Sequence, residues 1–167
     1  MMRKTISPIS PATASVTGAG NDEWLDLDAV ARVEITSEDE SFPIEHALGS
    51  ASTTGWRAAA TGPQVIRLLF DKPQTIRRIA VHFVDGTSER ASERMQEFAV
   101  YAGSGAELRE VVRQQWTFSP SGATEELEDY TVDLKGVTTL ELRIDPDRSH
   151  DPKLSQSYAS LQSLRLA

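Results

Sequence analysis

The stretch that decides the fold reads Gln64-Val-Ile-Arg-Leu-Leu-Phe-Asp-Lys-Pro-Gln-Thr-Ile-Arg-Arg-Ile-Ala-Val-His-Phe83. In its first half, every second side chain is apolar and falls on one face of an extended chain: Ile66, Leu68 and Phe70. Its second half does the same with Ile79, Val81 and Phe83. Alternation with a period of two on both sides of a short polar segment predicts a half-buried β-hairpin whose turn is Asp71–Gln74.

The same alternation recurs along the chain between segments rich in Gly, Pro and Ser. It predicts further strands at Val30–Thr36, Gln96–Ala102, Leu108–Phe118, Leu127–Leu134, Val137–Asp145 and Tyr158–Leu166. Helical patterns are few, and the clearest is a single turn at Ile44–Leu48. About eight mainly antiparallel strands with regularly spaced turns predict an all-β protein with a jelly-roll β-sandwich.

The chain of 167 residues is most simply one domain. We expect residues 1–20 to be a flexible N-terminal arm, and residues 21–167 to be the β-sandwich domain. The start has two basic residues, but the segment after them is small and polar and is interrupted by Pro8 and Pro11. Because this is not the apolar segment of a secretory signal, we expect a cytoplasmic protein.

Composition narrows the range of partners. The net charge of −8 argues against binding to nucleic acid or to an anionic membrane surface, since both need a basic surface. Cysteine is absent, so the fold has no disulfide framework. No apolar run has the length needed to span a membrane.

Connections between the predicted strands alternate between long and short. The short ones are Asp71–Gln74, Gly103–Glu107 and Lys135–Gly136, and the long ones are Ser37–Pro63, Asp85–Glu93, Ser119–Glu126 and Pro146–Gln156. If each strand crosses the sandwich once, successive connections lie at opposite ends, so all four long loops share one end. We call this the long-loop end. Loops grouped on a rigid scaffold are a common place for a binding site.

Several segments together resemble the discoidin or coagulation-factor-5/8 type C family. They are the helical turn, Gly55-Trp56-Arg57, Gly62-Pro63-Gln64 and the Ile76–Ile79 segment leading to Phe83. The family pattern Ala-x-Asp-Gly-x-x-x-Thr-x-Trp is matched at Thr54 and Trp56, whereas Leu48 replaces its Asp. The resemblance implies a galactose-binding-domain-like jelly roll whose loops at one end bind sugars, phospholipids, proteins or nucleic acid.

Many members of that family also carry a structural calcium, held by the first loop and by an acid in the last strand. Here Leu48 stands in the first loop, and Gln162 or Ser163 stands where the acid is expected. The sequence therefore predicts no cofactor, with calcium as an open alternative. Asp145–Asp151 imitates a calcium-binding loop but has His150 at the glycine position, so we interpret it as a solvated turn.

Catalytic motifs are absent from the sequence. It contains no Gly-x-Ser-x-Gly nucleophile elbow, no phosphate-binding P-loop and no His-Glu-x-x-His motif. The three histidines, His46, His82 and His150, have no metal-ligand spacing. These observations predict a non-catalytic binding module without a metal site.

The candidate ligand-binding residues are the arginine, histidine, tryptophan and glutamate side chains of the long loops: His46, Trp56, Arg57, Glu89, Arg90, Arg94 and His150. Arginine offers planar paired donors, and neutral imidazole both donates and accepts. Trp56 is either a stacking platform or a core plug, and the arginines either bind ligand or form salt bridges.

We expect carbohydrate binding; the alternative is an intracellular protein–protein interaction module. The oligomeric state is left open.

Overall fold

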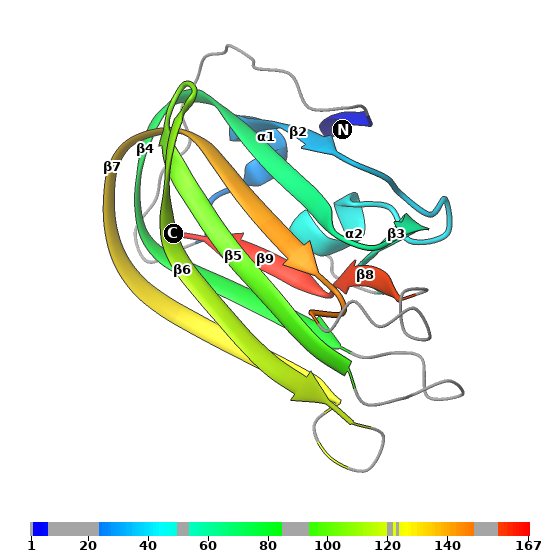
Figure 1. Cartoon of the computed structure of the whole chain (residues 1–167). Helices are drawn as coiled ribbons and strands as arrows, with labels where there is room; N and C mark the ends of the chain where they lie inside the picture. The colour runs from blue at the N-terminus through cyan, green and yellow to red at the C-terminus, as the bar shows by residue number, and fades with distance from the viewer. Residues whose placement is uncertain are drawn as a thin grey trace.

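The computed structural model of the chain describes residues 2–6, 24–49, 54–84, 94–119, 122, 124–148 and 157–167, and these form a jelly-roll β-sandwich (Figure 1). Its two short helices are α1 (Leu27–Val30) and α2 (Glu45–Leu48). The strands are β1 (Arg3–Ile6), β2 (Ala31–Ile35), β3 (Trp56–Thr61), β4 (Gln64–Val84), β5 (Arg94–Ser104), β6 (Glu107–Phe118), β7 (Glu125–Asp145), β8 (Tyr158–Leu161) and β9 (Ser163–Leu166). The all-β prediction is confirmed. None of the helices in the described ranges is long and apolar enough to cross a membrane.

The predicted hairpin at Gln64–Phe83 is wrong, because β4 is a single strand of 21 residues that bends where the turn was expected. Its pairing with β7 is interrupted between Leu69 and Gln74, and its register shifts again before Arg78. Pro73 lies in the first gap, where its missing N–H breaks no ladder hydrogen bond. The two halves of β4 therefore do not pair with each other as in a hairpin; the bend carries the chain from one layer of the sandwich into the other and back toward the same end (Figure 1).

Strand β7 bends beside β4, with Gly136 at a φ of 66°. The first half of β4 pairs with β2 and with the second half of β7, while its second half pairs with the first half of β7 and with β9. The second half of β7 also pairs with β5, and β5 pairs with β6. We call the sheet that contains β2, the first half of β4, the second half of β7, β5 and β6 the first layer. All pairings between the described strands are antiparallel apart from β1 with β2. Both long strands thus belong to both layers.

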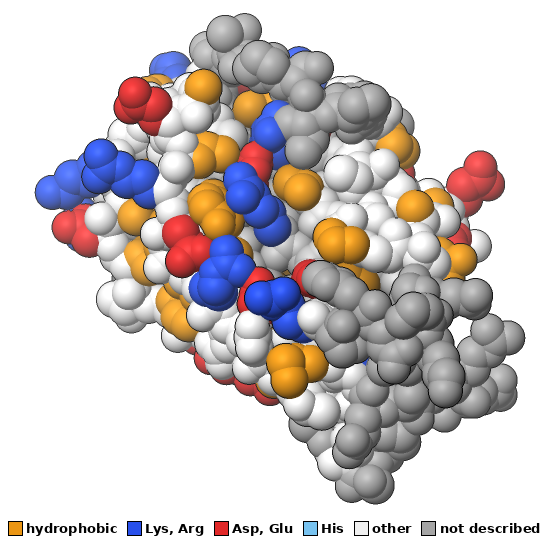
Figure 2. Space-filling model, viewed as in Figure 1, with side chains coloured by type: hydrophobic (Ala, Val, Ile, Leu, Met, Phe, Trp, Pro, Cys, Tyr) orange, Lys and Arg blue, Asp and Glu red, His pale blue; other side chains and the backbone are white. Residues whose placement is uncertain are grey.

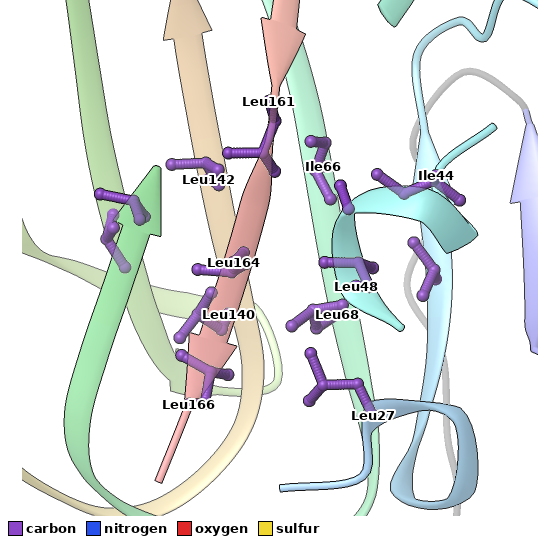
Figure 3. Packing of buried hydrophobic residues seen from close by; sticks show 14 of the residues in the cluster. Leu27, Ile44, Leu48, Ile66, Leu68, Leu140, Leu142, Leu161, Leu164 and Leu166 are labelled. Carbon is purple, nitrogen blue, oxygen red and sulfur yellow. The ribbon is translucent and has the colours of Figure 1, made fainter. Parts of the chain in front are cut away.

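The core lies between the two layers and is built from the alternating apolar side chains that the sequence predicts. Ile66, Leu68, Ile79, Val81 and Phe83 of β4 are each 1% exposed or less. Figure 3 shows Leu164 and Leu166 of β9 lying beside Leu140 and Leu142 of β7, with Leu27, Ile44 and Leu48 covering the neighbouring side. Burying an aliphatic side chain of this size contributes about 1.5–3 kcal/mol.

The N-terminal segment contributes a strand, which corrects part of the expected flexible arm. Residues 3–6 form β1 and pair in parallel with Arg32–Ile35. Lys4 Nζ lies 2.9 Å from Glu38 Oε1 and 2.7 Å from Glu45 Oε2, so β1 is also fixed to the chain around α2. Residues 7–20 of the expected arm lie outside the described residues.

The described strand ends are grouped as the loop lengths predict. Gln64 pairs with Ile144, Val84 with Glu125 and Arg94 with Phe118, and these ends lie toward the right and lower right of Figure 1. The turn from β5 to β6 lies at the upper left. The loops 85–93 and 149–156 themselves lie outside the described residues.

The outward face of the first layer carries a network of ion pairs. Glu34 and Glu141 are 4% and 2% exposed, and Arg67 lies between them at 3.4 Å and 2.8 Å. Arg143 bonds the other oxygen of Glu141 at 3.0 Å. Figure 2 shows the resulting alternation of basic and acidic side chains across this face. The guanidinium groups cover the carboxylates, which explains how charged residues are buried on an outer face.

Replacing Arg67 with methionine is expected to lower the free energy of unfolding by about 3–5 kcal/mol, because it leaves two buried carboxylates without their shared partner. Urea denaturation checks this value. Arg109→Met is the matched control: Arg109 is exposed and makes no ion pair within the described ranges, so its loss should change stability by less than about 0.5 kcal/mol. Equal stability of the two variants would contradict the role given to Arg67.

Glu97 supports a second, pH-dependent prediction. It is 8% exposed and accepts hydrogen bonds from Gln115, Arg113 and Arg148, and these lower its pKa against the opposing effect of burial. A lowered pKa in the folded state stabilises the fold above the ordinary glutamate pKa, and this stabilisation is lost as the pH falls through the folded value. Glu97→Gln should therefore cost about 1–3 kcal/mol at pH 7 and clearly less at pH 3 in urea titrations. A difference that does not depend on pH would contradict this.

Candidate functional site

A glycine turn at the start of β3 builds the candidate site. Gly55 has a φ of 73°, and a Cβ placed on it would lie 2.5 Å from the Leu161 carbonyl oxygen and 2.9 Å from the Gln162 Cα. Both the conformation and the close approach therefore require glycine. After this turn, Trp56 pairs with Leu161 and Arg57 with Ser160. The loop before β3 is thus held against the junction of β8 and β9.

A pocket of about 330 Å³ that opens to solvent lies at this junction, at the long-loop end. Four segments far apart in the sequence line it: Phe42, the 54–57 turn, Val84 at the end of β4, and residues 160–162. Trp56 and Leu161 are 1% exposed and form its apolar floor. Its polar lining residues are Thr54, Arg57, Ser160 and Gln162.

Trp56 is a core residue and not a stacking platform. Its ring is almost completely buried, and its indole Nε1–H donates to the Ser37 carbonyl at 3.2 Å. The face of the ring is therefore not available to stack on a ligand. The alternative left open by the sequence is decided in favour of the core plug, and Trp56 contributes to the site only as part of the pocket floor.

Arg57 is held in place by Phe42. The centre of its guanidinium lies 4.3 Å from the centroid of the Phe42 ring, a cation–π contact. The backbones of the two residues are also bonded, with Arg57 N–H donating to the Phe42 carbonyl at 3.1 Å. Both side chains are half-buried and line the pocket. The pair presents planar hydrogen-bond donors beside an apolar ring.

His46 contacts the pocket through Thr54. Its Nδ1 lies 2.9 Å from the Thr54 hydroxyl oxygen, and Thr54 lines the pocket whereas His46 does not. The imidazole therefore orients a hydroxyl that faces the pocket. Gln162 is the single residue between β8 and β9. Its backbone N–H donates to the His82 carbonyl at 2.8 Å, which fixes its position.

The structure does not bring Arg94 into this pocket. Its guanidinium donates to the Pro146 carbonyl at 2.6 Å and to Gln96 Oε1 at 2.8 Å, and it covers the Phe118 ring at 4.8 Å. These contacts join the start of β5 to the end of β7. Of the other predicted site residues, Glu89, Arg90 and His150 lie outside the described residues.

Sequence reasoning missed six lining residues: Phe42, Thr54, Val84, Ser160, Leu161 and Gln162. Thr54 carried a usable signal, because it matches the discoidin-type pattern next to Trp56. Gln162 carried another, since it stands near the acid expected in the last strand. Ser160 has no such signal; it reaches the pocket only because β8 pairs with β3 in this register.

The residues at the family's calcium positions do not fit the ion. Leu48 is 6% exposed and packs in the core, so the first loop places an apolar side chain where a carboxylate would be required. Gln162 and Ser163 supply no charge at the other position. Among the described residues, no group of three or more His, Cys, Asp or Glu side chains is arranged to hold a metal.

Comparison with known proteins gives similarity of fold. No family model and no curated protein matches the sequence. Among solved structures, the family 32 carbohydrate-binding module of Clostridium perfringens NanJ, in complex with galactose, is similar at a TM-score of 0.61 and 14% identity, covering 86% of this chain and 96% of that one.

Two further modules are similar over nearly their whole length. One is a C. perfringens module, CBM32-5, in complex with GalNAc-β-1,3-galactose, with a TM-score of 0.60, 15% identity and coverage of 86% and 99%. The other is a chitosan-binding module from a Paenibacillus chitosanase/glucanase, with a TM-score of 0.58, 16% identity and coverage of 86% and 98%. The chain therefore shares the β-sandwich fold of these modules.

The geometry at Gly55 predicts a difference between two glycine variants. Gly55→Ala should lower the free energy of unfolding by more than about 2 kcal/mol, because a left-handed φ and a backbone clash act together. Gly62→Ala is the matched control: Gly62 has a φ of 82° but nothing within 4 Å of the added Cβ, so only about 1–2 kcal/mol for the φ is expected. Urea denaturation compares them, and the NMR signals of Gln162 should shift only in Gly55→Ala. Equal losses would contradict the close approach.

Proposed function

We propose that this protein is a non-catalytic carbohydrate-binding module that holds a sugar residue in the pocket of Phe42, Thr54, Arg57, Ser160 and Gln162. The observation that carries the proposal is the combination of hydroxyl, amide and guanidinium groups above an apolar floor. Sugars present both hydroxyl groups and apolar C–H faces, and this pocket offers a partner for each. The space between the lining residues, with open solvent included, is about 330 Å³, so we expect the pocket to contact a single sugar residue.

The lining residues divide the recognition between them. Arg57 only donates hydrogen bonds, whereas the hydroxyls of Thr54 and Ser160 and the amide of Gln162 both donate and accept. A ring of sugar hydroxyls needs both kinds of partner. Phe42 and Val84 provide apolar surface for the C–H groups. His46 keeps the Thr54 hydroxyl oriented, which reduces the entropy lost on binding.

The similarity of fold supports this proposal, because two of the similar modules were crystallised with galactose or a galactose-containing disaccharide. The absence of catalysis is proposed from the lining itself. Hydrolysis of a glycosidic bond needs a pair of carboxyl groups that flank it. No acidic side chain is among the described residues that line the pocket.

The first test is a thermal-shift panel of galactose, GalNAc, glucosamine, glucose and oligosaccharides built from them. At least one sugar should raise the melting temperature, and raise it further as its concentration increases, because a ligand that binds only the folded state stabilises it. A panel in which no sugar raises the melting temperature would contradict the proposal and favour the alternative of a protein–protein interaction module.

The second test locates the site. Thr54→Val keeps the size of the side chain and removes its hydroxyl, so affinity for the sugar identified in the panel should fall about 5–10-fold, as expected for one lost hydrogen bond. Thr131→Val, on the exposed face of β7, is the control and should leave affinity unchanged. NMR titration measures both. An effect of equal size in the two variants would place the site elsewhere.

A further inference from the structure

We infer that the pocket prefers a sugar residue that carries a carboxylate, such as a uronic acid, with Arg57 as its counter-charge. The inference rests on the proposed function, since it names the class of sugar bound at the same site. Its basis is the charge of the pocket. Arg57 is the only charged side chain among the described lining residues.

Arg57 differs from the arginines that hold the scaffold together. On the outward face, Arg67, Arg113 and Arg143 each pair with a glutamate, and Figure 2 shows basic and acidic groups side by side there. Within the part of the chain that the structure describes, the Arg57 guanidinium has no ion-pair partner; its side-chain contact is the Phe42 ring. No carboxylate of the described residues therefore balances its charge, in a protein that carries eight more acidic than basic residues.

Two of the three acidic residues just before Phe42 are engaged elsewhere, and the third, Glu40, is exposed. Asp39 donates its backbone N–H to the Arg57 carbonyl at 2.9 Å, but its carboxylate accepts the N–H of Ser41 at 2.8 Å. The Glu38 carboxylate binds Lys4 and the N–H of Ile44, each within 3 Å. None of the three lines the pocket. Within the described residues, none of them forms an ion pair with Arg57, and the described lining holds no carboxylate that would repel an acidic ligand.

The geometry of Arg57 suits a carboxylate. Phe42 packs against one face of the planar guanidinium, so the edge that carries the N–H donors is fixed in orientation. A carboxylate can take two parallel hydrogen bonds from that edge, and hydrogen bonds between opposite charges are about twice as strong as neutral ones. A neutral sugar can satisfy the donors but leaves the half-buried charge without a partner. Partial burial strengthens the attraction relative to bulk water.

Galactose and galacturonic acid provide a sharp comparison, because they differ only in the oxidation state of C6. Single sugars are the right probes, since the net charge of −8 would repel a polyanion over a distance and obscure the local contact. NMR titration of the full chain at pH 7 should give a dissociation constant for galacturonate about tenfold lower than that for galactose. This ratio corresponds to one neutral hydrogen bond replaced by a charge-assisted one. The methyl ester of galacturonate, which is neutral, should bind as galactose does.

Variants assign the preference to Arg57. Arg57→Gln keeps a donor and removes the charge, so the ratio of the two dissociation constants should fall close to one. Arg57→Lys keeps the charge without the planar paired donors and should retain part of the preference. Arg109→Gln removes the same charge near the start of β6, beside the β5–β6 turn and outside the pocket lining, and should leave the ratio unchanged. The dispersion of the NMR spectra shows whether each variant is folded.

The outcomes separate the inference from the proposed function. If galactose binds as tightly as galacturonate or more tightly, the preference for acidic sugars is overturned and sugar binding stands. If the ratio in Arg57→Gln equals that of the wild type, the preference does not come from Arg57 and the inference is overturned. If no sugar binds, with or without a carboxylate, the proposed function itself fails.

Discussion

The pairing of β4 with β7 is the interaction on which the rest of the structure depends. The two strands run side by side through a common bend, so each supplies one half to each layer of the sandwich. Their inward side chains, among them Ile66, Ile79 and Leu140, make up much of the core. Because both strands return to the end from which they started, the beginning of β4 and its last residue, Val84, lie at the same end.

This return determines where a site can form. The end of β4 meets the β8–β9 junction through the bond from Gln162 N–H to the His82 carbonyl, and the 54–57 turn packs against the same junction. Rigid strands thus fix three of the four segments that line the pocket. Phe42 belongs to the fourth, which is bonded to the backbone of Arg57. A site assembled in this way is largely preformed, so little conformational entropy needs to be lost when a ligand binds.

Periodicity in the sequence predicted the class of fold and most strands, because alternation reports directly which face of a strand is buried. Periodicity could not distinguish a bend from a turn at Asp71–Gln74, because a proline with polar neighbours suits both. The pairing of β4 with β7 on both sides of this segment makes it a bend, and that pairing cannot be deduced from the alternation of β4 alone. It also missed β1, whose short sequence has no alternation, and β3, which is mostly small residues after Arg57. Of the pocket residues, Trp56 and Arg57 were predicted from their residue types and their place in a predicted long loop. Ser160 was not, because only the pairing of β3 with β8 brings it to the pocket. The cytoplasmic location stays a prediction.

The two kinds of arginine show how scaffold and site are separated in this chain. Arg67 forms ion pairs with both Glu34 and Glu141, so its charge is balanced within the protein. Removing Arg67 would leave these two buried carboxylates without the partner they share. Arg57 contacts an aromatic ring, and among the described residues no carboxylate forms an ion pair with it. An arginine used for stability needs a carboxylate from its own chain, whereas one used for recognition must keep its charge available. Within the described residues Arg57 has no such carboxylate, so the preference that we infer can be tested by substitutions at Arg57 while the ion pairs of the scaffold stay intact.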